Sequence, residues 1–329
     1  MGLYQQIADE IVEKIKKSHY VSGDKLPSIR QYAAQKHVSV NTVVSSYRLL
    51  EQRGFVEVRE KSGYIVLPFY ASSESMPLPM FESKRVELTT ANITPHANNR
   101  HPFERALASP DLIATQQLNK CVANTMRKQT IRTHLYGNVQ GEADLRNSLS
   151  KHFKQHGFSF ASNELVINNG CLDSIKIALE ITTKPGDSVA VSSPCFNGLL
   201  AMLAMMKRAV VEIPSSADGV DLAQVESLMA DNQISACLFT ANHQNPQGTS
   251  FPLVQKQALA SLSNRLNVPI IEDDVYQELH FAQTMPLPIK SFDKTGSVIW
   301  CSSISKTLAS GYRLGWALPG KFLAEFIQH

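Results

Sequence analysis

Apolar residues at the start of the chain follow a helical period. Four of them form one stripe at helical spacing: Ile7, Ile11, Val12 and Ile15. Ser28 and Ser39 each precede a further stretch of this kind, and a serine in that position caps the first turn of a helix. Gly54 follows the third stretch. The pattern therefore predicts three short helices, in which Tyr47 and Leu50 belong to the core.

Two short β-like runs come next, at residues 55–58 and 64–67. A polar turn with glycine, residues 59–63, joins them and predicts a hairpin. Three helices followed by a hairpin are typical of a winged helix–turn–helix. In that fold the third helix enters the major groove of DNA, and the hairpin lies along the backbone or the minor groove.

Residues 69–95 are rich in serine and proline and show no convincing period. Such a segment predicts a linker between two folded units. We therefore expect a first domain at residues 1–68 and a second at residues 96–329.

Beyond the linker, helical stretches alternate with short, continuous apolar runs. These runs occupy residues 165–167, 188–191, 210–213, 237–239, 268–271 and 298–300. Continuous apolar runs with helices between them predict a mostly parallel sheet covered by helices on both faces, an α/β fold. Ligands of such sheets bind beyond the carboxyl ends of the strands.

Residues with useful chemistry follow several of these runs. Gly170 and Cys171 open a helix, where backbone N–H groups bind phosphate. Phe196 offers a flat partner for an aromatic ring, and the amide of Asn245 is fixed by the Asn–Pro step that follows it. The acidic segment at residues 271–276 ends another run, and a carboxylate there beside a pyridine nitrogen would keep that nitrogen protonated. Lys306 follows the last run, where desolvation favours a neutral, nucleophilic amine.

Each of these residues also has an ordinary structural interpretation. Phe196 fits a core position, Asp273 or its neighbour Asp274 fits a helix cap, and Lys306 fits a surface lysine. The order of the whole set, and not any single member, favours a binding site.

Composition limits the class of protein. The chain has 329 residues, which predicts about two domains, and its 43% hydrophobic and 19% charged residues are typical of a soluble globular protein. No apolar run reaches the ~20 residues that span a bilayer, and no secretory leader is recognisable. Five scattered cysteines without a Cys-x-x-Cys pair indicate a reducing cytoplasm and neither a disulfide framework nor a metal site.

The positive charge lies at one end. Of the 32 Lys and Arg residues, 10 fall within the first 68 positions, together with 7 of the 29 Asp and Glu residues, so 22 of each sign remain. The net charge of +3 thus belongs to the first domain. This distribution favours a nucleic-acid-binding head on a neutral body.

Three motifs in the first domain carry a family resemblance. They are Gly-Asp-Lys-Leu-Pro-Ser-Ile-Arg, Val-Ser-Val-Asn-Thr-Val and Leu-Leu-Glu-Gln-Arg-Gly-Phe-Val. In this order, over residues 3–67, they resemble the DNA-binding head of GntR-type bacterial regulators. The resemblance implies that Arg30 contacts a phosphate. It places further DNA-binding residues at the start of the recognition helix and the tip of the wing: Ser39, Asn41, Thr42, Lys61 and Gly63.

Two positions depart from the GntR pattern. Many members have arginine where this chain has Val40, and some also where it has Val44. Because such arginines often read guanine edges, we expect a weaker or different direct readout of bases. Arg30 and Lys61 also fit solvated surface charges.

From Tyr136 to its end the chain resembles fold-type I enzymes of pyridoxal 5'-phosphate (PLP), the aspartate aminotransferase superfamily. The resemblance implies that Lys306 forms the internal aldimine and that Asp273 pairs with the pyridine nitrogen. It implies that Asn245 and Tyr276 bind the 3' oxygen and that Phe196 stacks on the ring. The phosphate would be held by Gly170, Cys171, Ser303 and Arg313. Tyr136 would reach the phosphate of a neighbouring subunit, which implies a homodimer.

Other catalytic motifs are absent from the sequence. There is no Gly-x-Gly-x-x-Gly, Walker A, His-Glu-x-x-His or Gly-x-Ser-x-Gly pattern. Aminotransferases of this fold continue past the lysine into a smaller domain with a substrate-binding arginine. We expect that C-terminal small domain to be missing here, because the chain stops at His329. Rapid turnover is therefore not expected.

A GntR-type head joined to an aminotransferase-like body resembles MocR-type transcriptional regulators. This resemblance implies a bacterial, cytoplasmic protein that binds double-stranded DNA at the nucleoid and senses PLP or an amino-acid or amine effector. One alternative is a PLP-dependent aminotransferase with an appended DNA-binding domain. Another is a DNA-binding protein whose body serves only for dimerisation, although such a scaffold has no need of Lys306 and Asp273.

Overall fold

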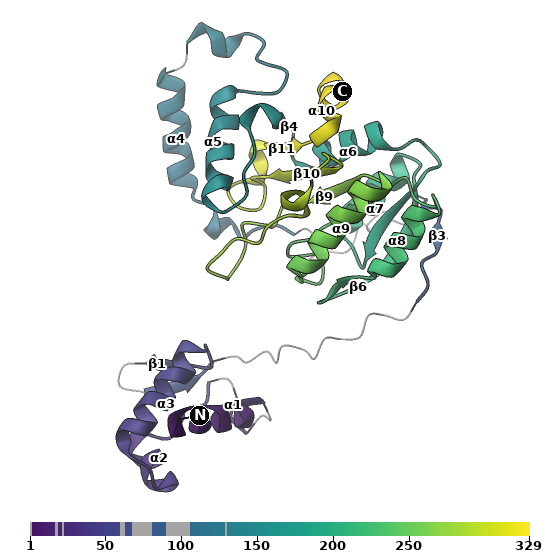
Figure 1. Ribbon diagram of the computed structural model, residues 1–329. Helices are drawn as coiled ribbons and strands as arrows, with labels where there is room; N and C mark the ends of the chain where they lie inside the picture. The colour runs from purple at the N-terminus through teal and green to yellow at the C-terminus, as the bar shows by residue number, and fades with distance from the viewer. Residues whose placement is uncertain are drawn as a thin grey trace. The chain divides into compact units, whose positions relative to one another are not determined.

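The computed structural model describes residues 2–16, 19–21, 23–59, 63–67, 81–89, 106–128 and 130–329. The chain divides into two compact units, Met1–Ser75 and Met76–His329 (Figure 1). No helix in the described part of the chain is long and apolar enough to cross a membrane.

The first unit is a winged helix–turn–helix, as predicted. Its helices are α1 (Leu3–Lys16), α2 (Ile29–Lys36) and α3 (Val40–Gln52), and β1 (Val56–Arg59) pairs antiparallel with β2 (Gly63–Val66). Both predicted caps are present. The Ser28 hydroxyl accepts the Gln31 N–H at 3.3 Å, and the Ser39 hydroxyl accepts the Thr42 N–H at 3.1 Å.

Tyr47 connects α3 to the rest of this unit. Its side chain is fully buried, and its hydroxyl donates to the carbonyl of Pro27 at 2.9 Å. Its ring meets that of Tyr64, on β2, edge to face with centroids 4.9 Å apart. The third helix and the hairpin therefore share one core, which fixes the helix relative to the wing.

A nine-stranded sheet organises the second unit. Eight strands lie in the order β3-β6-β5-β8-β9-β10-β11-β4, and β7 pairs with β6. Their bounds are β3 Arg85–Val86, β4 Val166–Asn168, β5 Ser188–Ser193, β6 Ala209–Ser216, β7 Gly219–Val220, β8 Ala236–Phe239, β9 Ile270–Asp273, β10 Val298–Ser303 and β11 Gly315–Leu318. The five strands β6, β5, β8, β9 and β10 run parallel to one another, whereas β11 is antiparallel to both of its neighbours.

Helices cover both faces of this sheet (Figure 1). Their bounds are α4 Thr115–Lys128, α5 Ala143–Gln155, α6 Cys171–Thr182, α7 Asn197–Met205, α8 Leu222–Ala230, α9 Leu253–Leu266 and α10 Leu323–Gln328. Successive strand residues face opposite layers. On β9, Ile270 packs in the cluster that includes residues of α8 and α9, and Ile271 packs in the cluster that includes residues of α6 and α7. The predicted α/β class is confirmed.

Two short strands differ from the sequence expectation. β3 lies inside the segment expected to be a linker and pairs antiparallel with β6. Side chains anchor it: Arg85 donates to the Ser188 hydroxyl at 3.0 Å, and Ser83 contacts Gln224. The predicted linker was therefore too long at its C-terminal end, because two residues are too few to show a period. The sequence reading also missed β11, which follows directly after the turn at Arg313.

Candidate functional site

A cavity of about 200 Å³ lies where the parallel strands end. Eight residues predicted from the sequence line it: Cys171, Phe196, Asn245, Asp273, Tyr276, Ser303, Lys306 and Arg313. Asp273 is the last residue of β9, Ser303 is the last of β10, and Cys171 is the first of α6. The structure thus brings together residues that are far apart in the sequence.

Asp273 lines this cavity and is almost completely buried. The Cys171 thiol donates a hydrogen bond to its Oδ1 at 3.2 Å. Burial raises the pKa of Asp273, whereas the thiol and the nearby charge of Lys306 act in the opposite direction. The Val275 backbone N–H also donates to this carboxylate. A buried carboxylate that lines the cavity is suited to a protonated ring nitrogen, which would supply both a charge and a hydrogen bond.

Lys306 is half-buried and follows β10. Its Nζ donates to the carbonyl of Ala106 at 2.6 Å and lies 5.8 Å from the ring centroid of Tyr276. Burial lowers the pKa of Lys306. The charge of Asp273 opposes this shift, and that of Arg313 adds to it. The environment therefore increases the share of neutral, nucleophilic amine.

Tyr276 and Asn245 form a polar pair on the cavity wall. The Asn245 amide Nδ2 donates to the Tyr276 hydroxyl at 3.3 Å. Burial raises the pKa of Tyr276, which keeps its hydroxyl protonated and able to donate. An amide and a phenol side by side can together bind one anionic oxygen.

The first turn of α6 and Arg313 form the other end of the site. Gly170 has φ +101°, which strains any residue with a side chain, and a Cβ there would displace the Arg313 guanidinium that lies against it. Arg313 donates to the carbonyls of Asn169 and Ser310 at 3.1 and 3.3 Å and remains exposed. A helix N-terminus beside an exposed guanidinium is suited to a phosphate group.

These groups fit PLP, because an amine, a buried carboxylate and a pair of hydrogen-bond donors surround one cavity. A guanidinium and a helix N-terminus suited to a phosphate lie at its other end. The sequence reading missed several lining residues, namely Leu107, Leu172, Thr240, Val275, Ser305 and Ser310. Thr240 and Ser305 follow β8 and β10. They could have been predicted, because ligands bind beyond the carboxyl ends of parallel strands. Nothing in the sequence pointed to Leu107.

Two predicted residues do not line the cavity. Gly170 lies against the guanidinium of Arg313, which does line the cavity. Tyr136 is fully exposed, and its role in a neighbouring subunit stays a prediction.

Buried amides and carboxylates hold the strand ends in place. Gln244 donates to the Ser192 hydroxyl at 2.6 Å and to the carbonyl of Pro194 at 3.1 Å, which ties the turn before Phe196 to the turn that carries Asn245. Next to Asp273, the carboxylate of Asp274 accepts the Trp300 indole N–H at 2.7 Å. These contacts limit how far the site residues can move.

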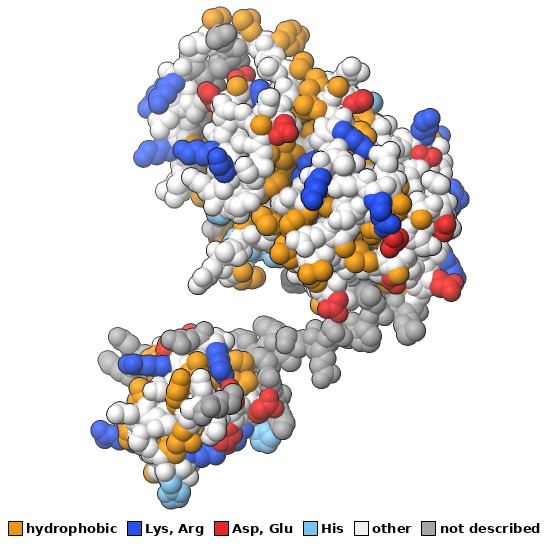
Figure 2. Space-filling model, viewed as in Figure 1, with side chains coloured by type: hydrophobic (Ala, Val, Ile, Leu, Met, Phe, Trp, Pro, Cys, Tyr) orange, Lys and Arg blue, Asp and Glu red, His pale blue; other side chains and the backbone are white. Residues whose placement is uncertain are grey.

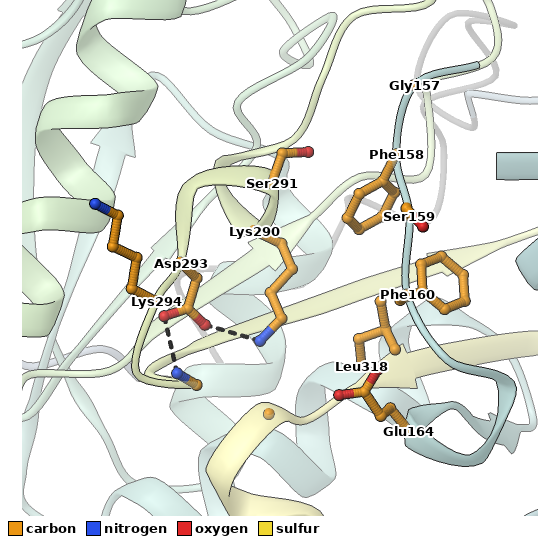
Figure 3. Close-up of a pocket in the computed structure, with 12 residues that line it drawn as sticks. Gly157, Phe158, Ser159, Phe160, Glu164, Lys290, Ser291, Asp293, Lys294 and Leu318 are labelled. Atoms are coloured by element: carbon orange, nitrogen blue, oxygen red, sulfur yellow. Dashed lines mark hydrogen bonds and ion pairs between the residues drawn. The ribbon is translucent and has the colours of Figure 1, made fainter. Parts of the chain in front are cut away.

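A second cavity, of about 500 Å³, is larger but contains none of the predicted site residues (Figure 3). Its wall includes Lys290, which donates to Asp293 at 2.8 Å and to the carbonyl of Val298 at 2.6 Å. Asp293 in turn accepts several backbone N–H groups, including that of Val298. This ion pair stabilises the loop before β10. The residues suited to binding a cofactor line the smaller cavity.

The start of α3 forms the candidate DNA interface. Arg30, Ser39, Asn41 and Gly63 are exposed, and Thr42 is partly exposed. The hydroxyls of Ser39 and Thr42 lie 2.8 Å apart and bond to each other. Lys61 lies outside the described residues. Lys and Arg side chains are spread over the visible face of this unit (Figure 2).

The fold and site define a winged helix–turn–helix protein with an aminotransferase-type body. Sequence models of two families match the chain: "Bacterial regulatory proteins, gntR family" over residues 3–66 and "Aminotransferase class I and II" over residues 99–322. The HTH-type transcriptional regulators YdcR and YjiR of Escherichia coli are 34% and 32% identical, and each alignment covers 98% of this chain and 70% of the relative. The chain therefore belongs to the HTH-type transcriptional regulators that join a GntR domain to a class I/II aminotransferase domain, as the MocR-type resemblance implied.

Solved structures show the same fold in the body. An archaeal alanine:glyoxylate aminotransferase has a TM-score of 0.63 at 23% identity over 73% of this chain and 64% of its own. The α-aminoadipate aminotransferase LysN of Thermus thermophilus, complexed with N-(5'-phosphopyridoxyl)-L-leucine, has a TM-score of 0.61 at 21% identity over 69% of this chain and 58% of its own. The chain thus spans less than two thirds of either structure.

Proposed function

We propose that this chain is a transcriptional regulator that binds operator DNA through α3 and binds PLP through Lys306. PLP, or an amino acid or amine that reaches the same site, would alter the binding of DNA. The observation that carries the proposal is that one chain combines an exposed recognition helix with a cavity in which Lys306 and Asp273 come together.

The DNA-binding role rests on the first unit. Its third helix is exposed at the N-terminal end, where helix–turn–helix proteins contact base edges. Arg30 is exposed as well, and so are Val58 and Gly63 in the described part of the hairpin, as contacts with the DNA backbone require. A homodimer would bind two half-sites, and it would act at the nucleoid in the bacterial cytoplasm.

The PLP-binding role rests on the second unit. When bound, PLP supplies a carbonyl carbon that links reversibly to amines and a pyridine ring that withdraws electrons. Lys306 would hold it covalently, and Asp273 would keep a proton on the ring nitrogen. Asn245 and Tyr276 would bind the ring oxygen, with Phe196 against the ring face. Arg313 and the first turn of α6 would hold the phosphate.

Two measurements on the full chain test this proposal. The first is the visible absorbance of the protein with PLP, followed by borohydride reduction and peptide mapping. We expect a reduced PLP adduct on Lys306 and none after Lys306→Ala. The second is the affinity for operator DNA, selected from a random duplex pool, with and without PLP and amines. We expect the affinity to change in the wild type and to stay constant in Lys306→Ala.

The results distinguish a regulator that responds to PLP from an aminotransferase with an appended DNA-binding domain. An adduct on another residue contradicts the assignment of Lys306. Release of a keto acid over many turnovers, with no effect on DNA affinity, favours the appended aminotransferase. The regulator has to respond to its ligand through a difference in affinity between two states.

A further inference from the structure

The outward face of α3 carries apolar and amide side chains in its first two turns. Val40 is 46% exposed, Asn41 and Ser45 are also exposed, and Val44 is partly exposed. The opposite face packs into the core of the unit through Val43, Ser46, Tyr47 and Leu50. The residues that face solvent are therefore the ones available to base edges.

Charge is absent from this stretch. Residues 38–47 contain no Lys, Arg, Asp or Glu, and the next cation along the helix is the exposed Arg48. Guanine is read chiefly by cationic donors that reach its O6 and N7 atoms. The first two turns of α3 have no such donor.

The capping contacts engage the hydroxyls of Ser39 and Thr42. The Ser39 hydroxyl accepts the Thr42 N–H, and the two hydroxyls bond to each other at 2.8 Å. Val40 and Asn41 are thus the exposed residues of the first turn that take no part in the cap. A branched apolar side chain suits the 5-methyl group of thymine, and an asparagine amide suits the N6 and N7 atoms of adenine.

We propose that Val40 and Asn41 make the recognition helix a reader of A·T pairs. Val40 packs against a thymine methyl group and Asn41 binds an adenine in the major groove. Val44, one turn further, extends the apolar contact, and Arg48 binds the phosphate backbone. This inference rests on the proposed binding of DNA and adds the kind of sequence that is bound.

The test begins with the full chain and a random duplex pool. In the enriched operator each thymine is replaced in turn by uracil, which removes only the methyl group. We expect one thymine per half-site at which this replacement weakens binding about fourfold, the loss for one buried methyl-sized group. Val40→Ala should weaken binding to the thymine operator and abolish the difference between thymine and uracil at that position alone.

Two further variants sharpen the assignment. Asn41→Ala should relax the preference for adenine by ~5-fold or more, the range for a bidentate contact. Val21→Ala changes another exposed valine, outside α3, and should leave the whole uracil profile unchanged. Because Val40 is solvent-exposed, its replacement should retain the helical circular dichroism and the unfolding midpoint of the wild type.

The outcomes separate this inference from the proposed function. If no sequence is enriched, the binding of operator DNA fails and the inference fails with it. If an operator is enriched but its uracil profile is the same in Val40→Ala as in the wild type, the assignment of Val40 is wrong while DNA binding stands. A contacted half-site made only of G·C pairs also overturns it.

Discussion

The amine of Lys306 donates a 2.6 Å hydrogen bond to the carbonyl oxygen of Ala106, a residue 200 positions earlier in the chain. Ala106 has φ +44°, an uncommon conformation for a residue other than glycine. The segment that follows, residues 106–113, lines a cavity of about 670 Å³ together with Lys306 and Tyr276. The proposed cofactor lysine therefore also anchors this segment.

Binding of PLP should release that anchor, because an amine linked covalently to another group gives up its place at the Ala106 carbonyl. We expect the backbone amides of residues 107–109 and 111–113 to exchange with deuterium faster after PLP is added. Lys306→Ala should exchange fast with or without PLP. Lys321→Ala, which removes a lysine bonded to Asn267 and Ser297, should keep the wild-type response. Equal exchange in the wild type before and after loading would contradict this role of Lys306.

The reactivity of Lys306 should depend on pH in a defined direction. Because burial lowers its pKa below the ordinary 10.5, the neutral amine should become abundant at a lower pH than in an exposed lysine. Arg313→Gln removes a repelling cation and should move the profile to higher pH. Asp273→Asn removes an attracting anion and should move it to lower pH. Acetylation of the PLP-free protein across pH, read by mass spectrometry of the Lys306 peptide, measures the profile. Shifts in the opposite directions would show that other groups set this pKa.

The hydroxyl of Tyr276 should contribute to the affinity for PLP. It accepts a hydrogen bond from Asn245 and faces the cavity, so Tyr276→Phe removes one donor to the ring oxygen and leaves the amide without its partner. Loss of one such hydrogen bond corresponds to ~2- to 12-fold weaker binding. Titration of the PLP absorbance measures it, with Tyr312→Phe, an exposed tyrosine outside the cavity lining, as the control. Equal losses in the two variants would argue against a specific contact at Tyr276.

The residues at strand ends could be predicted because apolar runs locate parallel strands, and such strands end at one edge of a sheet. Asp273 ends β9 and Lys306 follows β10, as their positions after the runs at 268–271 and 298–300 implied. The same rule covers Cys171, which opens α6 three residues after the end of β4. The helical period and the two serine caps were likewise sufficient to predict the three helices of the first unit.

Contacts that depend on tertiary folding could not be predicted. Ala106 and Leu107 reach the site from a segment without a period, and no local signal pairs them with Lys306. β3 consists of two residues, so its pairing with β6 is determined by the partner strand and by Arg85. Side-chain orientation is also a tertiary property, as shown by the thiol of Cys171, which lies against Asp273.

The aromatic cluster behind β10 should control the stability of the second unit. Phe153, on α5, is 1% exposed and meets the Trp300 ring edge to face with centroids 5.0 Å apart. Phe153→Ala leaves a cavity beside Trp300 and should lower the free energy of unfolding by ~3–5 kcal/mol. Phe281 is fully exposed, so Phe281→Ala should change the free energy of unfolding by less than ~0.5 kcal/mol.

Urea unfolding, followed by tryptophan fluorescence, measures both variants, because Trp300 and Trp316 both lie in the second unit. Trp300 also donates to Asp274, the neighbour of Asp273, so a ring that shifts into the cavity should disturb the end of β9. Phe153→Ala should therefore weaken PLP binding in addition to lowering stability, whereas Phe281→Ala should do neither. A Phe153→Ala protein as stable as the wild type would show that the ring is not part of a tightly packed core.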